Sequence, residues 1–168
     1  MKKHLILIVP ALLISLFIYL FYRTEKTLIN ELFAFFISKN SYSDMRSWIN
    51  LQFPLHKAII FSLPEGLWVF CITLTSKHLY FKFAKREIDC AIIPLLFSIG
   101  LEFLQLFHIT NGRFDLLDIL ISVFFWFTAY FIVDYQFSKE NPFKSFSMRT
   151  IAFLTSYAIV YLAHVFPS

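Results

Sequence analysis

Four polar side chains lie within a short, otherwise apolar stretch, and their spacing suits joint chemistry. Glu102 and Gln105 are three residues apart, and Ser98 lies one turn before Glu102 on the same face. Asp115 and Asp118 are also three residues apart, after a short connection in which residues 111–112, Asn-Gly, predict a tight turn. A spacing of three residues returns to nearly the same face of a helix. Carboxylates gathered in this way can bind a charged group, divide the roles of acid and base, or hold a divalent cation through oxygen ligands.

Two further residues extend this candidate site. Glu65 lies beside Pro64, which lacks a backbone donor, and Gly66, which permits a close backbone approach. Arg113 stands at the rim, and its guanidinium suits forked contact with phosphate or carboxylate. We therefore predict a ligand-binding site lined by six residues: Glu65, Glu102, Gln105, Arg113, Asp115 and Asp118.

The elements that must position these residues are apolar enough for a membrane. Of 168 residues, 58% are hydrophobic and 15% are charged, and the mean hydropathy is +0.67. Such values lie outside the usual range of soluble domains. Apolar runs near the length of a spanning helix cover residues 4–22, 58–76, 90–108, 116–135 and 149–166. The sequence thus predicts one all-α domain over residues 1–168, a polytopic membrane bundle of about five transmembrane helices.

The placement of lysine and arginine favours a cytoplasmic N-terminus and an outer C-terminus. Of the 15 basic residues, nine then lie inside and six outside. The outer connector, residues 24–57, carries Leu28, Leu32 and Phe35 at helical spacing, which predicts an amphipathic helix at the interface. It either caps the bundle or forms a lid over an outward-facing site.

Several classes of function have no support in the sequence. The basic residues fall in short loops, where membrane orientation explains them, so we expect no nucleic-acid partner. Cys71 and Cys90 form no metal-ligand pair and are predicted to be small core residues without a disulfide. We expect no cofactor and no metal, and the absence of a serine or cysteine nucleophile paired with histidine makes binding a better prediction than catalysis.

Three interpretations of the polar cluster stay open. The first is a structural role, in which Arg113 neutralises Asp115 or Asp118 and Gln105 bridges to Glu102. Asp115 would then cap the helix that it opens, because the first turn of a helix has unpaired N–H groups and favours a carboxylate. The second is a binding site for a charged headgroup or peptide at the outer leaflet. The third is an intramembrane enzyme that uses the paired carboxylates, with or without a divalent metal.

The same residues give the chain a resemblance to a known family. Glu102 and Gln105, followed after a turn by Arg113, Asp115 and Asp118, resemble the VanZ-like family of small bacterial membrane proteins. A weaker match covers residues 61–66, and the whole resemblance covers about residues 55–135. The chain departs from the family pattern in having one residue, in place of two, between the arginine and the first aspartate. Ser122 and Phe125 also stand where the family often has asparagine and glycine.

The resemblance implies a location and a class of partner. The founding member of the family is associated with low-level resistance to the glycopeptide teicoplanin, so the resemblance implies a multi-pass protein of the bacterial cytoplasmic membrane near cell-envelope precursors or lipids. We therefore expect membrane lipids and a lipid-linked or envelope-precursor ligand as partners. The leading hypothesis is an outward-facing polar pocket that binds a lipid headgroup or a peptidoglycan-type fragment. An intramembrane enzyme and a structural or assembly subunit are the alternatives.

Overall fold

The computed structural model describes residues 2–23, 28–83, 86–110, 113–133, 141, 150–151, 154–155 and 157. Most of these residues are helical, which agrees with the predicted all-α class. The helices are α1 (Lys2–Tyr22), α2 (Leu28–Ile37), α3 (Lys39–Gln52), α4 (Lys57–Ser76), α5 (Ile93–Leu106) and α6 (Leu116–Phe127). A 3-10 turn, Cys90–Ile92, precedes α5, and a π-helical turn, Thr128–Ile132, continues α6.

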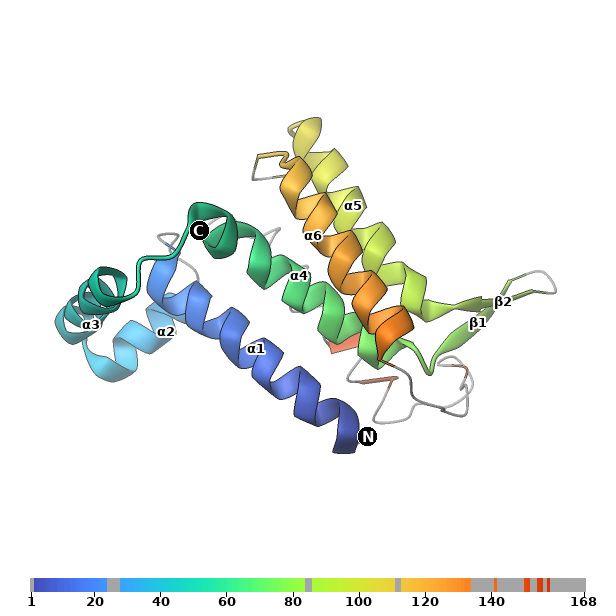
Figure 1. Cartoon of the computed structure of the whole chain (residues 1–168), viewed down its shortest axis with the longest axis horizontal. Coiled ribbons are helices and arrows are strands. Elements are labelled where there is room, and N and C mark those ends of the chain that lie inside the picture. The colour runs from blue at the N-terminus through green and yellow to red at the C-terminus, as the bar shows by residue number, and fades with distance from the viewer. Residues whose placement is uncertain are drawn as a thin grey trace.

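The helices are arranged around α4, as Figure 1 shows. Helix α1 runs antiparallel to α4 along one side, and α5 and α6 lie together on the other side. Helices α2 and α3 lie beside the C-terminal end of α1. An antiparallel hairpin of β1 (Tyr80–Phe83) and β2 (Arg86–Asp89), which the sequence did not predict, lies at the opposite end. The connections therefore place the start of α4, the end of α5 and the start of α6 at one end of the bundle.

Gly66 sets the close packing of α4 against α6. A Cβ atom at this position would lie 2.5 Å from Cγ2 of Ile121 and 2.5 Å from Cδ2 of Phe125. Distances this short exclude a side chain unless its neighbours shift. The predicted close backbone approach at Gly66 is thus confirmed.

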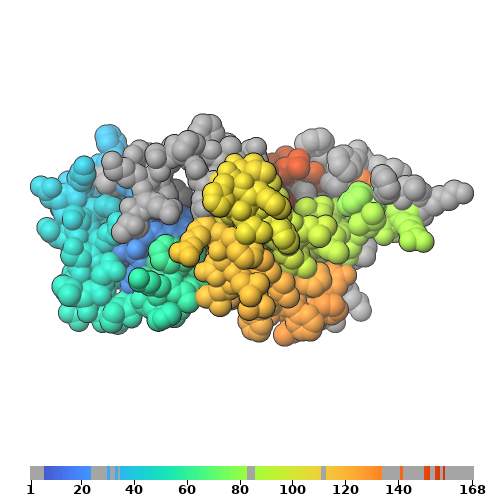
Figure 2. All heavy atoms as spheres, turned by 90° about the horizontal axis from the view of Figure 1, so that it is seen from above, coloured from blue at the N-terminus to red at the C-terminus, as the bar shows by residue number. Residues whose placement is uncertain are grey.

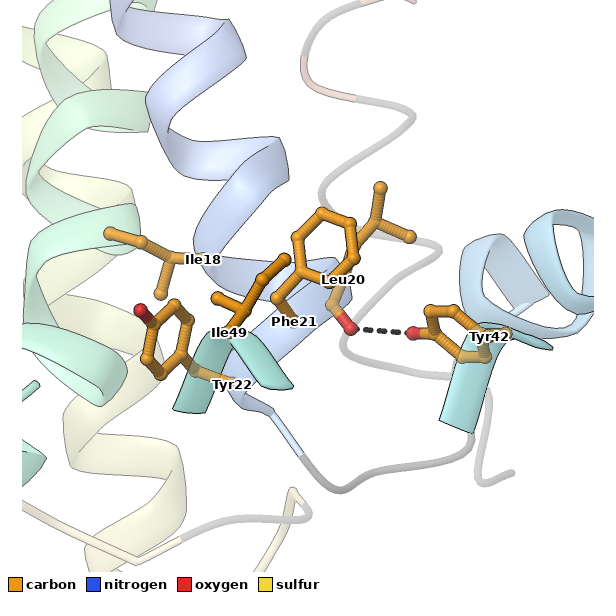
Figure 3. Close-up of a cluster of buried hydrophobic side chains, with 6 residues drawn as sticks. All are labelled: Ile18, Leu20, Phe21, Tyr22, Tyr42 and Ile49. Atoms are coloured by element: carbon orange, nitrogen blue, oxygen red, sulfur yellow. Dashed lines mark hydrogen bonds between the residues drawn. The ribbon is translucent and has the colours of Figure 1, made fainter. Parts of the chain in front are cut away.

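Polar side chains of α3 cap the C-terminal end of α1. The last carbonyls of a helix lack N–H donors within the helix itself. Here Tyr42 donates to the Leu20 carbonyl at 2.5 Å (Figure 3), and Asn50 donates to the Phe21 carbonyl at 2.8 Å. Arg46 donates to the Phe21 carbonyl as well. The predicted helix in the connector is therefore present, but as two helices that Ser38, with φ of 73°, separates.

Lys77 holds the opposite end of the bundle together. Its Nζ donates to the carbonyls of Ala129, Tyr130 and Val133 at 3.2, 2.8 and 2.7 Å. Carbonyls at the end of a helix attract a cation, both as hydrogen-bond acceptors and through the helix dipole. The end of α4 is thereby tied to the end of the α6 segment.

The described helices support a membrane location in part. Lys57–Ser76 is the one described helix that is both long and apolar enough to cross a membrane. Ile6–Tyr22, Cys90–Leu106 and Leu116–Ile132 are shorter apolar helices, and residues 149–166 lie largely outside the described residues. The five-helix bundle and its orientation therefore remain predictions. Cys71 and Cys90 are free and buried, as expected.

Candidate functional site

Three carboxyl groups converge from three helices. Glu65 of α4, Glu102 of α5 and Asp118 of α6 each offer an oxygen atom, and these atoms all lie within 4.8 Å of one another. The sequence predicted that these residues would line one site. The structure gathers three of the six predicted residues into one group, which we call the carboxylate cluster.

Buried serine hydroxyls line the carboxylate cluster. The Ser98 hydroxyl lies 3.0 Å from Glu65 Oε1 and 2.8 Å from the Ser122 hydroxyl. A hydroxyl has a single hydrogen, so Ser98 donates to Glu65 and Ser122 donates to Ser98. Ser62 hydrogen-bonds the Asp118 carboxyl group from α4. Ser98 and Ser122 are completely buried, and each lies one helical turn from a carboxylate of the cluster, so the same periodicity positions both groups.

Glu102 is the least exposed member, with only 1% of its surface accessible. Its Oε2 accepts a hydrogen bond from the backbone N–H of Asp115 at 2.9 Å. That N–H precedes the first turn of α6, where backbone donors lack partners within the helix. Glu102 therefore fixes the start of α6 against α5.

Asp115 performs a local structural task. Its Oδ1 accepts a hydrogen bond from the Leu117 N–H at 2.9 Å, which makes it the N-cap of α6. A carboxylate at this position is favoured because it satisfies one of the free helix donors. The side chain is exposed and does not belong to the carboxylate cluster. The predicted role of Asp115 as a cap is confirmed.

Asp118 has one buried oxygen atom, Oδ1, that no described residue contacts through a hydrogen bond. An unpaired buried acceptor costs on the order of 1–3 kcal/mol. A ligand that donates a hydrogen bond or carries positive charge would recover that free energy.

Among the described residues, the cation beside the cluster is Arg23, one of the six basic residues predicted to lie outside. Its guanidinium donates to the Phe61 carbonyl at 2.8 Å and to the Tyr19 hydroxyl at 2.6 Å. It lies close enough to interact electrostatically with Glu65 and Asp118. Its Nε is buried without a hydrogen-bond partner among the described residues. The sequence contained an indication of the position of this side chain. Arg23 follows Tyr19 by one helical turn, and a guanidinium often stacks on an aromatic ring at that spacing.

Besides Asp115, two predicted residues do not join the cluster. Arg113 is exposed and forms no ion pair with Asp115 or Asp118, so the predicted neutralisation by Arg113 is wrong. The side chain of Gln105 makes no hydrogen bond to a described residue, so the predicted bridge to Glu102 is absent from the part of the chain that the structure describes. The predicted turn at residues 111–112 lies outside the described residues.

The chemistry of the site follows from its donors and acceptors. Ionised carboxylates accept hydrogen bonds and donate none, so three of them side by side favour a positively charged group with several hydrogens. They are also hard oxygen ligands, which suits a divalent cation. No protein-family model, curated protein or solved structure matches this chain.

Proposed function

We propose that this chain is a VanZ-like, multi-pass protein of a bacterial cytoplasmic membrane that binds a cell-envelope ligand on its outer side. The ligand is a lipid headgroup or a peptidoglycan-type fragment, and the carboxylate cluster receives a protonated amino group of that ligand. The observation that carries the proposal is the approach of Glu65, Glu102 and Asp118 to within 4.8 Å of one another.

Energetics favour a binding role for these groups. An ionisable side chain within a membrane span costs about 2.5–3.5 kcal/mol on insertion scales. Three such residues, one from each of three helices, would cost several times that free energy. A purely structural role would require fewer ionisable groups. Two serine hydroxyls and one backbone N–H already hold the carboxyl groups in place. The open Oδ1 of Asp118 then supplies an acceptor for the ligand.

Arg23 adds a positive charge beside the carboxylate cluster. It lies near the carboxylates while its own side chain is fixed by the Phe61 carbonyl and the Tyr19 hydroxyl. A guanidinium is suited to phosphate or carboxylate. A ligand with an amino group and a neighbouring anionic group therefore fits the site better than a simple cation.

A lipid-binding comparison tests this proposal. The purified protein is offered phosphatidylethanolamine, phosphatidylcholine and phosphatidylglycerol, and native mass spectrometry measures the bound fraction of each. We expect phosphatidylethanolamine to bind best, because methylation removes the ammonium hydrogens and glycerol carries no positive charge. A soluble pentapeptide with a free lysine amine, offered as a competitor, distinguishes a peptidoglycan-type fragment from a lipid headgroup.

Neutral variants connect the binding to the cluster. Combining Glu65→Gln, Glu102→Gln and Asp118→Asn should weaken binding at least tenfold, which corresponds to about 1.4 kcal/mol. The matched control is Asp44→Asn with Glu87→Gln, which removes two exposed carboxylates and should leave binding unchanged. Unchanged binding by the folded triple variant would refute the proposal.

The second candidate function is an intramembrane enzyme that uses a divalent cation. The same approach of three carboxylate oxygens favours it, since hard cations take oxygen ligands. Titration with Mn²⁺, followed by electron paramagnetic resonance, separates the candidates. Two results together would favour the enzyme. The signal of free Mn²⁺ would fall with the parent but not with the triple variant, and a chelator would abolish the turnover of a lipid-linked substrate.

A further inference from the structure

The guanidinium of Arg23 lies against two aromatic rings. Its Cζ atom lies 4.3 Å from the centre of the Tyr19 ring and 5.7 Å from the centre of the Phe61 ring. Its Nη1 donates to the Tyr19 hydroxyl at 2.6 Å, and its Nη2 donates to the Phe61 carbonyl at 2.8 Å. Arg46 of α3 donates to the backbone carbonyl of Arg23. Three helices, α1, α3 and α4, therefore fix Arg23, and Figure 2 shows them side by side at one end of the molecule.

This arrangement leaves hydrogen-bond donors of Arg23 unused. A guanidinium carries five N–H groups and no acceptor, and two of the five have the partners just named. The Nε–H is buried and has no hydrogen-bond partner among the described residues. A buried donor without a partner is destabilising. An oxyanion that accepts from Nε–H and from a neighbouring guanidinium hydrogen would satisfy it with the forked geometry that arginine forms with phosphate.

The members of the carboxylate cluster that interact with Arg23 are the accessible ones. Glu65 and Asp118 are partly exposed, whereas Glu102 is only 1% exposed. Arg23 interacts electrostatically with Glu65 and with Asp118. A ligand that enters the site therefore meets a guanidinium and two carboxylates together, while Glu102 supports the cluster from within.

The opposite charges are held near each other without direct contact. Phe61 and Ser62 are consecutive residues of α4. The Phe61 carbonyl accepts a hydrogen bond from Arg23, and the Ser62 hydroxyl hydrogen-bonds Asp118. Arg23 nevertheless forms no ion pair with a carboxylate that the structure describes. Charges that served only to join the helices would gain most from direct contact. Here neutral groups hold each charge, so a ligand with both signs of charge can bridge them.

Arg23 lies at the level of lipid phosphates in the membrane location proposed above. Helix α1 has 21 residues, so it is about 31 Å long at about 1.5 Å per residue. The hydrocarbon core of a bilayer is about 30 Å thick. Arg23 directly follows Tyr22, the last residue of α1. With α1 across the hydrocarbon core, the guanidinium reaches the headgroup region.

We propose that Arg23 binds the phosphodiester of a lipid headgroup whose primary ammonium group is held by Glu65 and Asp118. The ligand class is an aminoalkyl phosphodiester lipid, of which phosphatidylethanolamine is the simplest probe. Arg23 then determines the preference for this class over amines that lack a phosphate. The assignment rests on the proposed function, because the carboxylate cluster must receive the ammonium group.

Three lipids separate the two halves of the headgroup. Phosphatidylethanolamine carries both groups, octadecylamine carries the ammonium group alone, and phosphatidylmethanol carries the phosphodiester alone. Each is offered to the purified full chain, and native mass spectrometry measures the bound fraction. We expect the parent to bind phosphatidylethanolamine about tenfold more tightly than either partial lipid, because only the complete headgroup pairs with both signs of charge.

Substitution of Arg23 should affect only ligands with a phosphate. Arg23→Gln should weaken the binding of phosphatidylethanolamine about tenfold without weakening that of octadecylamine. Arg23→Lys retains the charge but not the forked donors, so its affinity should lie between those of the parent and Arg23→Gln. The matched control is Arg86→Gln, which removes an exposed guanidinium from β2 and should leave all three lipids unaffected. Glu65→Gln with Asp118→Asn should weaken the binding of both amines.

A measurement on the unsubstituted side chain covers the case in which Arg23→Gln impairs folding. In a chain with ¹⁵N-labelled arginine, the Nε–H signal of Arg23 should shift and exchange more slowly with water when phosphatidylethanolamine is added. Octadecylamine should not slow the exchange. The signal is assigned by replacing each of the other arginines with lysine in turn. The same exchange rate with and without phosphatidylethanolamine would refute the contact.

The remaining outcomes separate this assignment from the proposed function. If folded Arg23→Gln binds phosphatidylethanolamine as the parent does while the neutral carboxylate variant does not, the role of Arg23 fails and the proposed function stands. If both variants bind it as the parent does, both proposals fail. An equal loss of octadecylamine binding in Arg23→Gln would show that Arg23 only positions the carboxylates. Competition by soluble glycerophosphoethanolamine as strong as that by the lipid would overturn the lipid as the ligand.

Discussion

Glu102 and Asp115 are joined by a hydrogen bond across the connection between α5 and α6. The backbone N–H of Asp115 donates to Oε2 of Glu102 at 2.9 Å, although the two residues are 13 positions apart. The bond fixes the start of α6 at the level where Asp118 meets Glu65 and Glu102. A carboxylate of the candidate site is thus also a structural support for the helix that carries another.

Truncation of Glu102 should destabilise the protein more than its neutralisation. Glu102→Ala leaves the Asp115 N–H without its acceptor, which should lower the free energy of unfolding by about 1–3 kcal/mol. Glu102→Gln retains an acceptor oxygen and should cost less. Both variants remove the same charge, so thermal unfolding in detergent isolates the hydrogen bond. Equal melting temperatures for the two would contradict the structure.

Asp115 should behave as a helix cap. Asp115→Ala should cost about 1 kcal/mol of stability, because the Leu117 N–H loses its acceptor, whereas Asp115→Asn should be nearly neutral. The same unfolding measurement compares them. Because the Asp115 side chain lies outside the carboxylate cluster, Asp115→Asn should also bind phosphatidylethanolamine as the parent does. A large binding defect in that variant would return Asp115 to the site.

Gly66 and Gly100 should respond to alanine substitution in opposite ways, because Gly66 packs against a neighbouring helix and Gly100 faces open space. Gly66→Ala places a methyl group 2.5 Å from Ile121 and Phe125, and such overpacking costs about 1–3 kcal/mol. Gly100→Ala meets no atom within 4 Å and should gain up to about 1 kcal/mol from higher helix propensity. Accumulation in the membrane and thermal unfolding check both. Equal effects at both positions would show that α4 and α6 are not packed closely at Gly66.

Lys77 should stabilise the bundle through the carbonyls at the end of the α6 segment. Lys77→Met retains the apolar stem but removes the donors to Ala129, Tyr130 and Val133, which should cost about 1–3 kcal/mol. Lys82→Met is the matched control, because Lys82 is exposed and its ion pair with Glu87 is worth under about 1 kcal/mol. Hydrogen exchange of residues 128–133 should accelerate only in the Lys77 variant. Identical exchange in both would rule out the cap.

Most of the features that could be predicted involve residues that lie close together in the sequence. The apolar runs indicated helices, the spacing of Ser98 and Glu102 placed them on one buried face, and Asp115 was expected as a cap. Gly66 was expected at a close helix contact, and both cysteines were expected as free core residues. These features depend on helical periodicity, backbone conformation and local hydrogen bonds, all of which the sequence contains directly.

The identity of the cation beside the carboxylates depended on the tertiary structure. Arg113 is near Asp115 in the chain, yet it points to the surface, while Arg23 reaches Phe61 from another helix. The capping of α1 by α3 likewise joins segments distant in sequence. By itself, the sequence determined the helices, their polar faces and the local caps, because those follow from periodicity and backbone chemistry. Which polar groups meet was decided only by the packing of α1, α4, α5 and α6. The packing of the helices sets the distances between their long side chains, and these distances determine which side chains can interact.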